Sequence, residues 1–148
     1  MTTFIDHVHG LTKQTFKKGE TVLAQGEKKK ALYFLCEGKV EILKNDTPIC
    51  MVADRGAVFG EVSVLLNIAQ TATVRAIEPS TFFVIREAPK YLQTHSALSL
   101  LLGKLLARRL VEADSYLLDI KQKLAALSQH VGDKVPEEIL FRQLPAKS

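Results

Sequence analysis

The segment from Phe59 to Ala76, with the sequence FGEVSVLLNIAQTATVRA, combines residue types that suit an anionic ligand. Gly60 lets the backbone turn sharply or approach a ligand closely, and Glu61 places a carboxylate beside it. Residues 62–66 are long enough for one or two helical turns. Because the first amides of a helix have no acceptor inside it, and its dipole favours negative charge there, we predict that a phosphate binds near residues 61–63.

The end of the same segment has the pattern of a strand with one polar face. Thr71, Thr73 and Arg75 alternate with three apolar residues, and a period of two is typical of a strand. A glycine, an acid, a short helix, a loop and a polar strand thus follow one another. This order indicates a ligand pocket.

The segment resembles the phosphate cassette of the cyclic-nucleotide-binding domain family, which reads F-G-E, two small or apolar residues, L-L, a loop, and P-R-(A/S/T)-A-T-V. Two upstream segments resemble further family motifs: F-x-K-G-E-x-V-x-x-Q-G-E at residues 16–27 and L-Y-F-x-x-E-G-x-V at residues 32–40. The resemblance covers residues 12–128 and implies a mainly β fold with α, a jelly-roll-like β-roll followed by a long C-terminal dimerisation helix. The matching cassette positions are Phe59, Gly60, Glu61, Leu65, Leu66, Ala72, Thr73 and Val74.

The resemblance also implies roles for the cassette residues. Gly60 and Glu61 would hold the ribose 2′-hydroxyl of a cyclic nucleotide, and Ser63 with the amides near it would face the cyclic phosphate. Thr71 would add a hydroxyl contact to the phosphate or to a guanine. The complete set of expected ligand-binding residues is Gly60, Glu61, Val62, Ser63, Gln70, Thr71 and Thr73.

Two cassette positions depart from the family pattern. Ala69 stands at the position of the proline and Gln70 at that of the arginine. Glutamine offers neutral donors where a guanidinium offers a charged fork, and a charge-assisted hydrogen bond contributes about 1.5 to 3 kcal/mol. Its loss would weaken binding by roughly ten- to a hundredfold. We therefore expect cyclic AMP or cyclic GMP to bind only weakly.

Short strand-type segments separated by glycines and polar clusters predict that the β-roll occupies residues 12–86. Residues 40–43 and 48–53 flank Lys44-Asn45-Asp46-Thr47, which predicts a hairpin in which Asn45 and Asp46 adopt positive φ. Residues 1–11 are expected to form a short helix or an arm.

After the roll the pattern becomes helical, and helices are expected over residues 88–128. The sequence therefore predicts one domain over residues 1–128 and a tail over residues 129–148. Pro136 can start one short helix in this tail, ending at Phe141.

From Leu106 to Leu127, apolar residues recur at alternating spacings of four and three, which is the pattern of a heptad seam. The residues from Leu98 to Leu105 crowd several helix faces and are expected to pack on the β-roll. The alternative, a long helix folded back on its own roll, stays open. The expected dimer interface comprises Leu106, Leu110, Ala113, Leu117, Ile120 and Leu124.

The composition is that of one globular domain of 148 residues. No apolar run is long enough to span a membrane and no signal-peptide pattern occurs, so a cytoplasmic location without a membrane anchor is expected. The net charge of +4 is scattered except at Lys28–Lys30 and Arg108–Arg109, and the residues after the seam are too few for a helix-turn-helix domain, so specific DNA binding is not expected. Cys36 and Cys50 are expected to be reduced, mostly buried thiols.

Two functions stay open at this point. One is a regulatory homodimer that senses a cyclic nucleotide or related phosphorylated ligand and signals to a protein partner through the long helix. The other is a dimeric adaptor that keeps the fold but has lost the ligand. An enzyme is not expected, because Ser63 has no histidine near it in sequence and no P-loop occurs. No metal or other cofactor is expected either, since His7 and His9 have no third ligand nearby.

Overall fold

The computed structural model describes residues 3–128. The chain divides into two compact units, one ending at Leu102 and the other beginning at Gly103. The short helix expected from Pro136 to Phe141 lies outside the described residues. The long helix α4 (Ser96–Ser128) runs through the boundary between the units.

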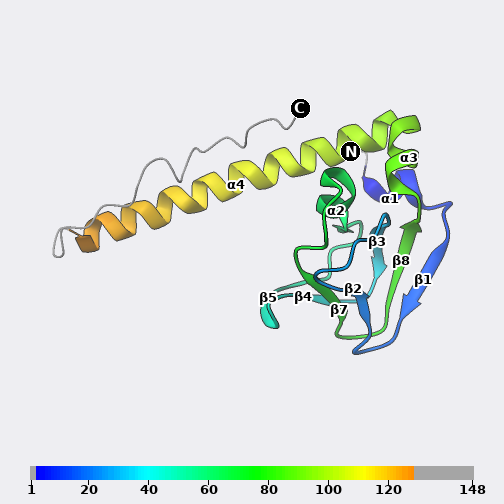
Figure 1. The fold of residues 1–148 in the computed structure, drawn as a ribbon, viewed down its shortest axis with the longest axis horizontal. Coiled ribbons are helices and arrows are strands. Elements are labelled where there is room, and N and C mark those ends of the chain that lie inside the picture. Colours follow the sequence, from blue (N-terminus) through cyan, green and yellow to red (C-terminus); the bar gives the residue numbers. More distant parts are fainter. Residues whose placement is uncertain (1–2, 129–148) are drawn as a thin grey trace. The chain divides into compact units, whose positions relative to one another are not determined.

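The first unit is a roll of two antiparallel, four-stranded sheets (Figure 1). Their strand orders are β1-β8-β3-β6 and β2-β7-β4-β5. This confirms the expected fold, which is mainly β with α: a jelly-roll-like β-roll followed by a long C-terminal helix. The strands are β1 (Lys13–Phe16), β2 (Thr21–Leu23), β3 (Leu32–Glu37), β4 (Val40–Lys44), β5 (Thr47–Val52), β6 (Val58–Phe59), β7 (Thr73–Ala76) and β8 (Ser80–Ile85).

The expected N-terminal helix is α1 (Phe4–Val8), which begins with a capping box. The amide and hydroxyl of Thr3 both donate to Oδ2 of Asp6, over 2.8 and 3.1 Å. These hydrogen bonds stabilise the ionised carboxylate and hold the pKa of Asp6 below its usual value.

The core of the roll is an aromatic cluster centred on Phe82 in β8. Its ring meets the rings of Phe16, Tyr33 and Phe59 edge to face, with centroids 5.6 to 6.0 Å apart. Apolar side chains of the second sheet, including Val40 and Val74, belong to the same buried cluster. The core therefore joins the two sheets, and it positions the loops at their ends.

The predicted hairpin is present between β4 and β5. Asn45 and Asp46 have φ values of 51° and 61°, as expected. Its loop is shorter than expected, because Lys44 and Thr47 pair with each other as the last residues of the strands. Gln25 fixes the loop, since its Nε2 donates to Oδ1 of Asn45 and its Oε1 accepts from the Asn45 amide.

Helix α3 (Ala88–Thr94) precedes the start of α4. The expectation that the residues from Leu98 to Leu105 pack on the roll holds only in part. Leu98 and Leu102 are each 1% exposed, but Leu100 is 61% exposed. A helix buries only the side chains on one stripe, which explains why leucines on its other faces stay accessible.

In the second unit, apolar side chains of α4 lie open within this chain. Leu106, Leu117 and Ile120 are half-buried, whereas Leu110, Ala113 and Leu124 are exposed. Val111, Tyr116 and Leu127 are exposed as well. None of the helices in the described residues is both long and apolar enough to cross a membrane.

The two cysteines are free, as expected, but they are not mostly buried. Cys36 is half-buried in β3, and Cys50 is exposed. The expectation was wrong for Cys50 because it lies on β5, which is an edge strand of its sheet and has a neighbour, β4, on one side only.

Candidate ligand-binding site

The cassette begins where β6 runs into the short helix α2 (Glu61–Leu66). Gly60 is the N-cap of this helix and has a φ of 91°, in the left-handed region. A Cβ atom at this position would lie 2.7 Å from the carbonyl oxygen of Ala31. Both facts require glycine at this position, where the backbone turns sharply against the neighbouring loop.

Helix α2 ends in a tight turn that uses Ser63. The Ser63 hydroxyl donates to the carbonyl of Ile68 over 2.5 Å, and the Ile68 amide donates to the carbonyl of Ser63 over 3.3 Å. Asn67 between them has a φ of 54°. The Ser63 hydroxyl therefore stabilises the turn. Val62 beside it is half-buried.

Polar side chains are concentrated inside this part of the roll. Among the described residues the buried polar side chains are Glu61, Ser63, Gln70 and Ser80, and the first three belong to the cassette. Gln70 is only 7% exposed, and its Nε2 atom has no hydrogen-bond partner among the residues that the structure describes. An unpaired buried donor costs about 1 to 3 kcal/mol, so the position of Gln70 favours a ligand or water that accepts from it.

The polar strand begins later than the alternation predicted. Strand β7 starts at Thr73, and Thr71 lies in an exposed bend before it. Thr73 faces the β2–β3 loop, because its Oγ1 accepts from the amide of Gln25 over 3.0 Å. Arg75 forms a salt bridge with Glu41 of β4, in which its Nε lies 2.8 Å from Oε1. The charge of Arg75 is therefore paired with that of Glu41.

The sequence did not predict that the loop between β2 and β3 forms one side of this site. The backbone N–H of Gln70 donates to the carbonyl of Glu27 over 2.8 Å, and the backbone N–H of Gly26 donates to the backbone carbonyl of Gln70 over 2.9 Å. The Q-G-E motif of residues 25–27 is the signal that could have indicated this contact, because it and the cassette belong to the same family pattern.

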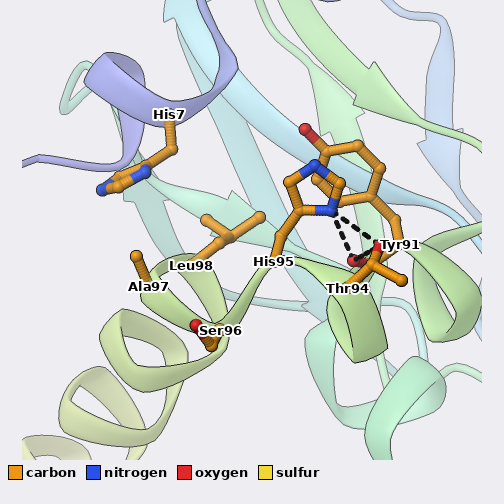
Figure 2. A pocket seen from close by; sticks show the side chains of 7 residues that line it. All are labelled: His7, Tyr91, Thr94, His95, Ser96, Ala97 and Leu98. Atoms are coloured by element: carbon orange, nitrogen blue, oxygen red, sulfur yellow. Dashed lines mark hydrogen bonds between the residues drawn. The ribbon is translucent and has the colours of Figure 1, made fainter.

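A cavity of about 260 Å³ lies elsewhere in the first unit, and no cassette residue lines it. It is lined by His7, Tyr91, Thr94, His95, Ser96, Ala97 and Leu98. Figure 2 shows the His95 ring stacked on that of Tyr91, with centroids 3.6 Å apart. Nδ1 of His95 lies 2.8 Å from the Tyr91 carbonyl and 3.0 Å from Oγ1 of Thr94, and these contacts orient the ring.

Metal binding has no support in the part of the chain that the structure describes. Among these residues no group of three or more histidines, cysteines or acids is placed to hold an ion. His7 and His9 lie on and just after α1 rather than on a strand. Residues two apart in a strand share a face, but on a helix they point to different sides.

The structure combines a β-roll, a glycine-capped cassette helix with buried polar groups beside it, and a long helix that follows the roll. These features together define the class of protein. The sequence model described as the cyclic nucleotide-binding domain matches residues 13–89, just over half of the chain. The chain belongs to the cyclic nucleotide-binding domain family.

The relatives that the chain matches are much longer proteins. Over 63 residues the chain is 36% identical to a cGMP-dependent protein kinase of Eimeria tenella, which covers 43% of this chain and 6% of the kinase. Over 132 residues it is 29% identical to the potassium channel KOR1 of Oryza sativa, covering 86% of this chain and 15% of the channel. The chain therefore spans only a small part of these relatives.

A similar solved structure is the catabolite activator protein of Thermus thermophilus. It superposes with a TM-score of 0.68 at 24% identity and covers 79% of this chain and 58% of the activator. This likeness supports the fold alone.

Proposed function

We propose that this protein is a non-enzymatic regulator that senses cyclic AMP, cyclic GMP or a related phosphorylated ligand at its atypical cassette. The observation that carries the proposal is the group of buried polar side chains at that site, with Nε2 of Gln70 unpaired. A roll that had lost its ligand would be expected to fill this space with apolar side chains, because an orphaned donor destabilises the fold.

In this proposal each cassette residue keeps the role that family membership suggests. Glu61 accepts a hydrogen bond from the ribose, and Gly60 allows the backbone to approach it. The amides of residues 61–63 face the phosphate, and Gln70 contributes a neutral donor. Thr71 and Thr73 lie at the rim of the site, where Thr71 is exposed.

The output of the sensor is proposed to pass through α4 as a homodimer that contacts a protein partner in the cytoplasm. The exposed apolar residues of the helix, including Leu110 and Leu124, support this step, because a contiguous exposed apolar stripe marks an interaction surface. The same stripe also favours the second candidate, a dimeric adaptor without a ligand. The two candidates differ only in what happens at the cassette.

Isothermal titration calorimetry of the 148-residue protein with cyclic AMP and cyclic GMP separates them. The sensor predicts saturable binding of at least one nucleotide, which Glu61→Ala weakens by roughly tenfold through loss of a charged hydrogen bond. Thr47→Ala, an exposed change in the β4–β5 hairpin, is the control and should bind like the parent. Flat titrations of a parent with an intact circular dichroism spectrum would reject the sensor and leave the adaptor.

A further inference from the structure

The β2–β3 loop, residues 24–31, meets the cassette at both of its ends. Its first half pairs with Gln70 through the two backbone hydrogen bonds of Gly26 and Glu27. Its second half reaches α2, because the carbonyl of Lys29 lies 3.5 Å from the Ser63 hydroxyl and that of Ala31 lies against Gly60. The loop therefore borders the residue that replaces the arginine and the helix start that faces a phosphate.

This loop carries the densest positive charge of the roll. Lys28, Lys29 and Lys30 are consecutive and exposed, and Glu27 is the one acid among residues 24–31. None of the three ammonium groups forms a salt bridge with a residue that the structure describes. A free positive charge is thus held beside a site that has lost its own.

Lys30 is the best placed of the three. It lies between the two residues whose carbonyls meet α2, and its own carbonyl accepts from the Ala88 amide over 2.9 Å, so its backbone is fixed. The ammonium of Lys29 is engaged elsewhere, 5.3 Å from the centroid of the Tyr33 ring. The ammonium of Lys30 has no such contact with any residue from 3 to 128.

We infer that Lys30, with Lys28 beside it, supplies the counter-charge for the anionic group of the ligand that Gln70 cannot supply. This inference rests on the proposed function and names the cation of its site. In this chain the positive charge lies on the loop that borders the cassette and not at the cassette position of Gln70. Because an ammonium is a point charge without the planar fork of a guanidinium, it neutralises the phosphate while Gln70 and the helix amides set the geometry.

The location of the charge has a measurable consequence. An exposed lysine is screened by salt, whereas a buried pair is screened much less. The affinity of the parent for a cyclic nucleotide should therefore fall as ionic strength rises from 0.05 to 0.5 M (roughly 14 to 4 Å of screening length). A variant without Lys30 should show a weaker dependence on salt.

The test compares Lys30→Gln with Lys18→Gln by calorimetry with cyclic AMP and cyclic GMP. Both changes remove one exposed positive charge, but Lys18 lies in the turn between β1 and β2, at the opposite end of the roll from α2 (Figure 1). Lys30→Gln should weaken binding about tenfold or more and flatten its salt dependence, whereas Lys18→Gln should change neither. Adding Gln70→Arg to Lys30→Gln should restore the affinity, and in the parent it should gain less.

The outcomes distinguish this inference from the proposal on which it rests. If the parent binds and Lys30→Gln binds equally well, or weakens no more than Lys18→Gln, the inference is wrong while the sensor stands. If the parent binds neither nucleotide, the proposed function fails and this inference fails with it. Circular dichroism of each variant verifies that the exposed substitutions leave the fold intact.

Discussion

The β-roll and the part of α4 after Leu102 use the same apolar residue types in opposite ways. In the roll, Phe34, Phe82 and Leu35 are fully buried, whereas in the helix Leu110, Val111 and Leu127 are all more than 60% exposed. Burying such side chains stabilises a protein by about 1.5 to 3 kcal/mol each. This burial stabilises the roll, whereas the exposed side chains of the helix contribute no such free energy within the chain. The roll therefore buries its apolar side chains within one chain, while those of the helix stay accessible, as the proposed interaction surface requires.

The largest difference between the two regions is expected when one apolar side chain is removed from each. Phe82→Ala deletes the ring that contacts three other aromatic rings, and should lower the free energy of unfolding of the roll by about 3 to 5 kcal/mol. Leu110→Ala removes an exposed side chain and should change that free energy by no more than about 0.5 kcal/mol. Urea denaturation followed by near-ultraviolet circular dichroism measures both.

Equal losses for the two variants would contradict the comparison, because they would mean that Leu110 supports the roll as strongly as its core does.

A second test asks whether the exposed stripe of α4 is a dimer interface. Leu117→Asp places a charge at the centre of the predicted seam, and burying a charge without a partner costs several kcal/mol. We expect the dissociation constant of the dimer to rise by about a hundredfold or more, as measured by light scattering over a concentration series. Leu118→Asp carries the same charge on a helix position outside the seam and should leave the dimer intact.

If Leu117→Asp dimerises as the parent does, or if the parent itself is monomeric, the helix does not use this seam with a second copy.

The smallest expected effect compares one ion pair from each region. Arg75 and Glu41 form a partly buried pair between β7 and β4, whereas Lys123 and Asp119 form an exposed i,i+4 pair on α4 at 3.0 Å. Double-mutant cycles should give a coupling of about 0.5 to 1 kcal/mol for the first pair and about 0.3 kcal/mol for the second. A larger coupling on the helix would reverse the ranking that burial predicts.

Local patterns predicted much of the fold. The two left-handed residues Asn45 and Asp46 placed the hairpin, and alternation placed β7 to within two residues, because both depend on neighbours in sequence. The sharp backbone turn at Gly60 was predicted from the residue type, since few other residues adopt a φ of 91°.

The sequence did not predict contacts between segments that are distant along the chain. The exposure of Cys50 depends on β5 being an edge strand, and the docking of residues 26–31 against the cassette depends on how the two sheets close. The orphaned Nε2 of Gln70 was also unpredictable, because burial and the absence of a partner are properties of the folded environment.

One substitution tests most directly whether the buried donor of Gln70 is kept for a ligand. Gln70→Met keeps an unbranched side chain of similar size and removes the unpaired donor. It should raise the free energy of unfolding of the ligand-free protein, by up to about 1 to 3 kcal/mol, and weaken cyclic-nucleotide binding about fivefold or more, since a hydrogen bond contributes about 1 kcal/mol.

Gln14→Met is the matched control, because Oε1 of Gln14 is likewise buried and unpaired but lies in β1, outside the cassette. It should not change the affinity. We predict that Gln70→Met raises stability and lowers affinity, as measured by thermal denaturation and calorimetry on the same samples. A Gln70→Met variant that is more stable and binds as tightly as the parent, or one that is less stable, would contradict this prediction.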